Sequence, residues 1–145
     1  MKKVILLFFV AFLYISSFGQ NRDDQTAILQ QCIDHSEIQK CYPTDDEGKP
    51  KQLTIYYWHP LLFPLDLGVT KGGKSIQYLV MSEKSEINET SVFFKKFMVT
   101  NDTATANFEF SYKKDNRTKT MQLNLDFIKT EGVWKITDSS IRNNQ

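Results

Sequence analysis

The 145-residue sequence has few of the side chains that build metal and redox sites: it has two cysteines and two histidines. Cys32, Cys41, His35 and His59 show no zinc-ligand spacing, so we predict no metal site and no cofactor. No cysteine follows the small residues near the N-terminus, which argues against lipid attachment. The sequence also lacks a nucleophile motif of the form G-x-S-x-G. These absences leave no coherent catalytic set, and no catalytic residue is predicted.

An apolar stretch long enough to span a membrane is also missing. Residues 4–15 form a twelve-residue apolar run behind Lys2 and Lys3, whereas a spanning helix needs roughly 20 apolar residues. A positive start, a short apolar run and then small residues are typical of a secretory signal peptide. We therefore expect cleavage between Gly19 and Gln20, and a soluble exported protein, periplasmic or secreted, without a membrane span.

Neither sign of charge is in excess. The chain has 18 Lys and Arg against 17 Asp and Glu. Removal of residues 1–19 takes away two lysines and no acids, which leaves a net charge of about −1. A nearly neutral chain has no broad attraction for nucleic acid, so no nucleic-acid partner is predicted. Residues 20–145 have the length of a single domain.

One motif suggests nucleotide chemistry. Residues 68–75, GVTKGGKS, match the G-x-x-x-x-G-K-S pattern of a phosphate-binding loop. Such a loop requires a helix after its serine, so that the helix N-terminus faces the phosphates. The residues after Ser75 read IQYLVM, which is a strand pattern. We therefore predict that the protein does not bind nucleotides.

The same residues predict a β-hairpin. Gly72 and Gly73 suit a two-residue turn that needs positive φ. This turn sets Lys71 opposite Lys74 at an exposed tip. The register then pairs Val69 with Ile76, Leu67 with Tyr78, and Leu65 with Val80 on one apolar face.

Residues 23–40 predict one helix, because Ile28, Leu29 and neighbouring apolar residues fall at helical spacing. Nine residues of helix would separate Cys32 from Cys41 by about 13 Å, too far for a disulfide. A Cys32–Cys41 bond therefore requires the helix to end between the two residues. The alternative is two small thiols that are not bonded.

From residue 53 onward the chain reads as strands. Residues 104–112 and 121–127 alternate apolar and polar side chains, as expected for a sheet with one buried face. A final turn at residues 129–132 sets Phe127 opposite Trp134. One helix followed by hairpins predicts an α+β domain, in which the N-terminal helix packs on a curved antiparallel sheet of about six to seven strands.

The C-terminal third combines a polar turn at Asn101-Asp102, an alternating strand from Ala104 and the ending GVWKI at residues 132–136. In these features it resembles small exported proteins of the cystatin-like or nuclear-transport-factor-like superfamily. The resemblance implies a cone-shaped sheet around a helix, with a pocket at the open end. It implies no particular reaction, because such folds host enzymes, ligand binders and protein-binding modules.

Aromatic residues around the second histidine are the candidate site. Tyr57, His59 and Phe63, together with Trp134, are predicted to line a ligand or partner pocket; the alternative is that they are core residues and a strand end. The leading interpretation is an exported, non-enzymatic domain that binds a protein partner or an apolar small molecule. A periplasmic inhibitor or immunity protein that blocks a toxin is one alternative. A small-molecule isomerase or hydrolase using His59 is the other.

Overall fold

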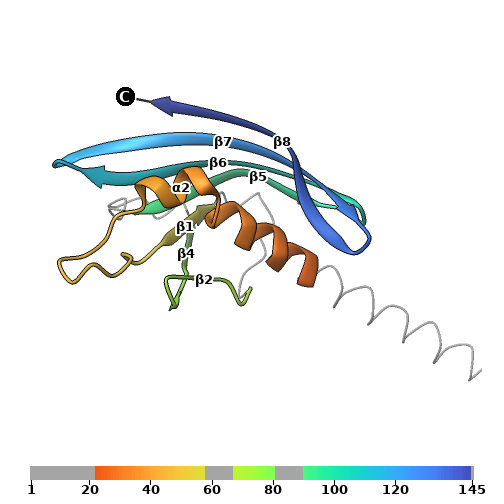
Figure 1. Ribbon diagram of the computed structural model, residues 1–145, viewed down its shortest axis with the longest axis horizontal. Coiled ribbons are helices and arrows are strands. Elements are labelled where there is room, and N and C mark those ends of the chain that lie inside the picture. The colour runs from red at the N-terminus through yellow and green to blue at the C-terminus, as the bar shows by residue number, and fades with distance from the viewer. Residues whose placement is uncertain (1–21, 58–66, 81–89, 145) are drawn as a thin grey trace, which may run out of the picture.

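The computed structural model describes residues 22–57, 67–80 and 90–144. Within these ranges the chain forms a mixed six-stranded sheet, a small two-stranded sheet and two short helical segments (Figure 1). The predicted α+β class is confirmed.

The elements have the following bounds. The helical segments are residues 22–33 and α2 (Ser36–Cys41). The strands are β1 (Thr54–Tyr57), β2 (Thr70–Lys71), β3 (Lys74–Ser75), β4 (Gln77–Val80), β5 (Ser91–Val99), β6 (Thr103–Lys114), β7 (Arg117–Thr130) and β8 (Val133–Asn144). The large sheet has the order β4-β1-β5-β6-β7-β8, and β2 and β3 form the small one.

The prediction of an antiparallel sheet is wrong for its first half. Strands β5 to β8 form an antiparallel meander, but β1 pairs in parallel with both β4 and β5. The short strand β1 thereby lies between two partners that come later in the chain. Local alternation of side chains carries no information on strand direction, so the pattern of residues 53–58 could not reveal this arrangement.

The single helix predicted for residues 23–40 is two segments. His35 interrupts it with an extended backbone (ψ 137°) and acts as the N-cap of α2. Its Nδ1 atom accepts a hydrogen bond from the backbone N–H of Glu37 at 3.3 Å. A side chain that satisfies one of the first free N–H groups of a helix favours a start at that position.

The hairpin predicted around Gly72-Gly73 forms only at its tip. Both glycines have positive φ, and Lys71 lies opposite Lys74 as expected. Beyond two residue pairs the prediction is wrong, because the following residues leave the hairpin and pair with β1. The Gln77 N–H donates to the Leu53 carbonyl at 3.2 Å. Tyr78 then pairs with Ile55 rather than Leu67, and Val80 pairs with Tyr57, while its predicted partner Leu65 lies outside the described residues.

The register predicted for the last hairpin is wrong by two positions. Glu131 and Gly132 both have positive φ and form a two-residue turn, where the sequence favoured a four-residue one. Phe127 therefore lies opposite Ile136 instead of Trp134. A bulge follows directly after this pair in the β7–β8 ladder.

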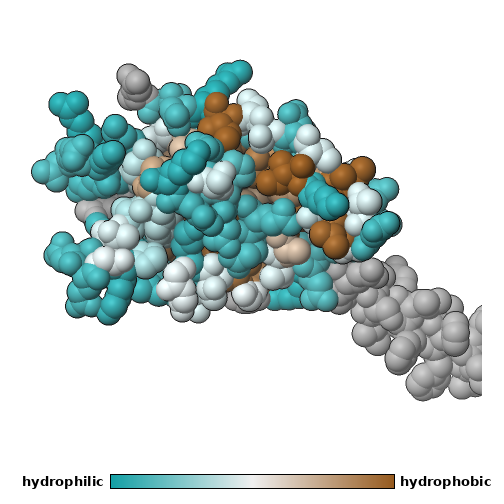
Figure 2. Space-filling model, viewed as in Figure 1, coloured by the Kyte–Doolittle hydropathy of each residue, from teal (hydrophilic) through white to brown (hydrophobic). Residues whose placement is uncertain are grey.

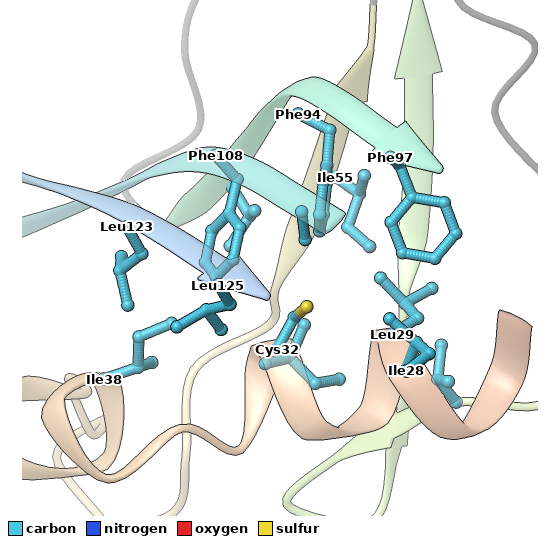
Figure 3. Packing of buried hydrophobic residues seen from close by; sticks show 14 of the residues in the cluster. Ile28, Leu29, Cys32, Ile38, Ile55, Phe94, Phe97, Phe108, Leu123 and Leu125 are labelled. Carbon is cyan, nitrogen blue, oxygen red and sulfur yellow. The ribbon is translucent and has the colours of Figure 1, made fainter. Parts of the chain in front are cut away.

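The core lies on the face of the sheet that carries the apolar side chains of β6 and β7. Ile28, Leu29 and Cys32 of the first helical segment are fully buried and belong to the same apolar cluster as Phe108 and Leu125. Figure 3 shows these helical side chains pointing toward the strands. The opposite face of the meander carries polar residues for most of its length, as the strict alternation requires.

Candidate functional site

A hollow of about 310 Å³ lies where α2 meets the ends of β6, β7 and β8. We name it the α2 pocket. It is lined by Glu37, Lys40, Cys41, Tyr112, Lys119, Thr120, Met121, Asn143 and Asn144. Its volume is at the lower end of the roughly 300–1,000 Å³ that small-molecule sites occupy.

Three lining residues come from one face of α2. Glu37, Lys40 and Cys41 are separated by three and four positions, which brings them together on a helix. The Lys40 ammonium donates to the Glu37 carboxylate in an exposed ion pair. This contact with Lys40 is the main cause that lowers the pKa of Glu37. Glu37 therefore stays ionised and neutralises Lys40.

The opposite wall comes from neighbouring strands in register. Tyr112 lies opposite Lys119 in the β6–β7 ladder, and Met121 lies opposite Asn143 in the β7–β8 ladder. Opposed residues of antiparallel strands share a face, so these four side chains point to the side that α2 covers. Met121 is buried and supplies an apolar floor, while Lys119 and Asn143 are exposed at the rim.

The thiol of Cys41 lies within the α2 pocket and is protonated. Its Sγ atom lies 3.3 Å from the carbonyl oxygen of Glu37 and 3.5 Å from that of Ile38, to which the S–H can donate. Partial burial raises the pKa of Cys41, and a hydrogen bond with the Tyr112 hydroxyl lowers it by less. Burial also raises the pKa of Tyr112. At neutral pH both groups are thus hydrogen-bond donors.

The pocket contains hydrogen-bonding groups without protein partners. Within the described part of the chain, no carboxylate pairs with the Lys119 ammonium, and the side-chain amide of Asn143 makes no hydrogen bond. Because Glu37 already neutralises Lys40, the positive charge of Lys119 is left uncompensated by the residues that the structure describes at the rim. A donor-rich hollow with an excess positive charge suits an anionic ligand.

Two of the four pocket residues proposed from the sequence, Tyr57 and Trp134, are described by the structure, and they lie far apart in the sheet. Tyr57 ends β1, whereas Trp134 lies near the start of β8, and three strands separate them, a span of about 19 Å at the usual strand spacing. Trp134 is buried, and its Nε1–H donates to Asp24 at 2.9 Å. His59 and Phe63 lie outside the described residues.

The cysteines are both free thiols. Cys32 is fully buried in the core, and burial alone raises its pKa far above the ordinary value. Cys41 follows the break at His35, so the helix does end between the two cysteines, yet no bond joins them. The disulfide that the sequence left open is therefore absent from the structure.

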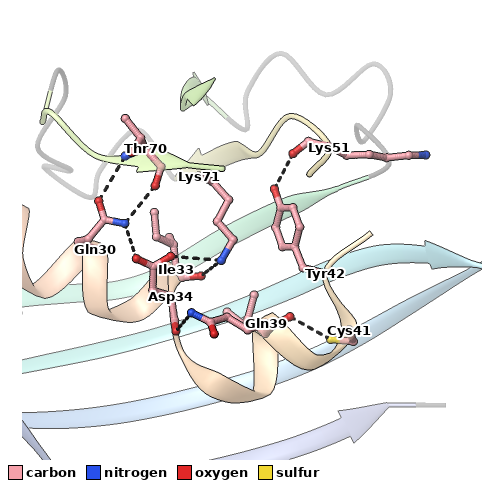
Figure 4. A network of polar contacts seen from close by, with 10 residues as sticks. Gln30, Ile33, Asp34, Gln39, Cys41, Tyr42, Lys51, Thr70 and Lys71 are labelled. Atoms are coloured by element: carbon pink, nitrogen blue, oxygen red, sulfur yellow. Dashed lines mark hydrogen bonds and ion pairs between the residues drawn. The ribbon is translucent and has the colours of Figure 1, made fainter. Parts of the chain in front are cut away.

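A second polar cluster involves Lys71, which is buried at 8% exposure and not at an exposed tip as predicted. Its Nζ donates to the Ile33 carbonyl at 3.0 Å and to Asp34 at 3.2 Å, and lies 4.8 Å from the centre of the Tyr42 ring (Figure 4). The Gln30 side chain makes two hydrogen bonds with the backbone of Thr70 in β2. These contacts fasten the β2–β3 hairpin to the end of the first helical segment, where free carbonyl groups favour a cation.

The phosphate-loop motif is explained by the same hairpin. Lys74 donates to the Pro50 carbonyl at 3.0 Å, and a Cβ atom on Gly72 would lie 2.5 Å from the Pro50 ring. The residues after Ser75 lead into β4 rather than into a helix. Close packing against Pro50 and a positive φ are thus sufficient reasons for glycine at position 72.

Comparisons with protein-family models, curated proteins and solved structures gave no match. Among the described residues, no group of three or more His, Cys, Asp and Glu is placed to hold a metal ion. No helix in the described ranges combines the length and the apolar character needed to cross a bilayer.

The sequence reasoning placed no residue in the α2 pocket, and it named Cys41 only as a possible disulfide partner of Cys32. The spacing of Glu37 and Lys40 was the one available signal, because it places both on a single helical face. No local signal connects α2 with Lys119 or Asn143, which join the site only through the strand registers.

Proposed function

We propose that the protein is an exported, non-enzymatic binding domain that holds a small anionic molecule in the α2 pocket. The observation that carries this proposal is the Lys119 ammonium, uncompensated among the described residues, together with the free side-chain amide of Asn143 on the same face, at a hollow of about 310 Å³. A carboxylate or phosphate group would accept hydrogen bonds from these donors, and charge-assisted bonds are about twice as strong as neutral ones.

The protonation of the pocket supports binding over catalysis. Covalent catalysis by cysteine requires a thiolate, which a cationic neighbour or a helix N-terminus normally stabilises. Cys41 instead lies at the C-terminal end of α2, next to free carbonyl groups, and its pKa is raised. His35, the histidine nearest to it in sequence, is engaged as a helix cap. These features make a weak nucleophile and leave it without an adjacent base.

The lining of the pocket favours a polar ligand over the apolar one expected from the sequence. Met121 is its one apolar side chain, and the other eight lining residues carry polar or ionisable groups. An apolar ligand would leave these groups desolvated without partners, which costs free energy.

Export and the resemblance to the cystatin-like or nuclear-transport-factor-like superfamily remain proposals. The N-terminal charge and apolar run support export, and sequencing the exported chain should give Gln20 as its first residue. The curved meander, with helical residues buried against one face, supports the resemblance (Figure 1). Both are consistent with a ligand pocket at one end of the sheet.

The second candidate function is the binding of a protein partner, including the inhibitor or immunity role. Its specific support is an apolar group on the outer face at one end of the sheet, where Met98 and Val133 are more than half exposed and Ile128 is 42% exposed. In the view of Figure 2, brown surface gathers toward the side where β8 begins, while most of the remaining coloured surface is teal or white. Exposed apolar patches often mark protein contacts.

A thermal-shift scan with acetate, succinate, citrate and phosphate tests the leading proposal. A ligand at 100 times its Kd stabilises the folded state by about 2.7 kcal/mol. For a domain of this size that is roughly a 10 °C rise in Tm. We expect at least one anion to raise Tm, Lys119→Ala to abolish the rise, and Lys135→Ala, an exposed lysine on the outer face, to retain it. A rise that is equal in both variants, or no rise with any anion, would refute the proposal.

A further inference from the structure

The twelve-residue strand β8 forms one edge of the large sheet. Among the described residues its only neighbour is β7, and the strand is exposed at every position except Trp134 and Ile141. Edge strands in monomeric proteins are usually short, or are interrupted by proline, bulges or inward charges. Here a bulge lies at Thr137, and the residues after it run on without proline or a further irregularity. The segment from Asp138 to the end of β8 is thus free to pair with another strand.

The outer face of this edge carries two opposite charges without ion-pair partners. Asp138 lies directly opposite Asp126 of β7, and like charges in that position repel each other. Arg142 lies opposite Gln122 on the same face, four residues further along. Neither Asp138 nor Arg142 forms a salt bridge within the described part of the chain. Asp138 and Arg142 are therefore opposite charges on one strand that do not form an ion pair with each other.

We propose that β8 pairs in antiparallel fashion with β8 of a second copy of this chain, about a two-fold axis through Ser140. Such a dimer joins the two sheets edge to edge and covers the β8 edge of each copy. The register sets Ser140 opposite Ser140, Ser139 opposite Ile141, Asp138 opposite Arg142, Thr137 opposite Asn143, and Ile136 opposite Asn144. The Asp138–Arg142 pair occurs twice, because a two-fold interface repeats each contact.

The charges select this register over its neighbours. A two-fold axis perpendicular to the sheet keeps both outer faces on one side. It must pass midway between the two copies of one residue, and each choice of that residue defines a register. With the axis at Asp138 or Arg142, like charges meet at the centre of the interface. With the axis at Ser139 or Ile141, Asp138 has no cation opposite it. Only the axis at Ser140 pairs Asp138 with a cation, and it pairs Arg142 at the same time.

Charge reversal tests this arrangement in solution by sedimentation equilibrium of residues 20–145 over a range of concentrations. The wild-type chain should show a concentration-dependent dimer. Asp138→Arg sets arginine opposite arginine, and Arg142→Asp sets aspartate opposite aspartate, so each variant alone should raise the dimer Kd at least about tenfold. The two variants mixed should form a heterodimer, because both of their cross pairs are again opposite in charge.

Two further samples make the test independent of folding. Asp138→Arg combined with Arg142→Asp in one chain should restore the wild-type Kd, which no general loss of structure would do. Lys135→Asp reverses a charge on the same outer face at the other end of β8, and should leave the dimer intact. The proposal is wrong if the wild-type chain stays monomeric up to millimolar concentration, or if its dimer is unchanged by both single reversals. Because the readout is mass, failure here leaves the ligand proposal unaffected.

Discussion

Lys71 and Lys74 occupy facing positions in one hairpin, but Lys71 is buried and Lys74 is partly exposed. Replacing each by alanine therefore compares the contribution of a buried lysine to stability with that of a partly exposed one. Lys71→Ala removes a hydrogen bond to the Ile33 carbonyl and an ion pair with Asp34. A hydrogen bond from a charged group contributes about 1.5–3 kcal/mol. Asp34 is 42% exposed, so solvent screens its pair with Lys71 and that contribution is small.

The expected loss for Lys71→Ala is therefore about 2–3 kcal/mol of the free energy of unfolding, most of it from the buried hydrogen bond and the lost side-chain packing. For a domain of this size, the corresponding fall in Tm is roughly 8–12 °C. Lys74→Ala removes one hydrogen bond to the Pro50 carbonyl at a partly exposed position and should cost less than about 1 kcal/mol. Lys71→Met, which keeps the aliphatic stem but not the charge, should fall between the two.

Urea denaturation followed by tryptophan fluorescence measures these three variants against the wild-type chain. The difference between Lys71→Ala and Lys74→Ala is the informative quantity, because both remove the same side chain from the same hairpin. If the free energies of unfolding of the two variants agree within about 0.5 kcal/mol, Lys71 behaves as the exposed residue predicted from the sequence. Its buried contacts then contribute nothing to stability.

Two other predictions concern titration and thiol access. Burial lowers the pKa of His35, and its Nδ1 must be unprotonated to accept from Glu37, so the unfolded chain binds more protons. The free energy of unfolding should therefore be intact above the ordinary histidine pKa of about 6.5 and decline as pH falls below it. His35→Asn keeps a capping side chain that does not titrate. In urea denaturation between pH 7.5 and 5.5, this variant should show a smaller decline in the free energy of unfolding than the wild-type chain. In maleimide labelling of the native protein, Cys41 should react slowly and Cys32 only in denaturant, with no mass change on reduction. Rapid labelling of Cys32 would contradict its burial.

The elements that depend on neighbouring residues could be predicted from the sequence. The alternation in residues 104–112 and 121–127 matches the buried and exposed faces of β6 and β7. The turn at Gly72-Gly73 follows from the same kind of local rule, since its φ angles are positive. Such features follow from backbone sterics and side-chain periodicity, which act within a few residues.

The tertiary structure decided the direction of β1, the registers and the position of charges. Parallel pairing of β1 with β4 takes Gln77 away from the hairpin, and the tight turn at Glu131-Gly132 shifts Trp134 by two places. Lys71 becomes buried because a helix end supplies carbonyl acceptors from a distant part of the chain. The α2 pocket likewise combines one helical face with the ends of three strands. Such contacts join residues far apart in sequence, so their free energies depend on the packed arrangement and leave no local pattern to read.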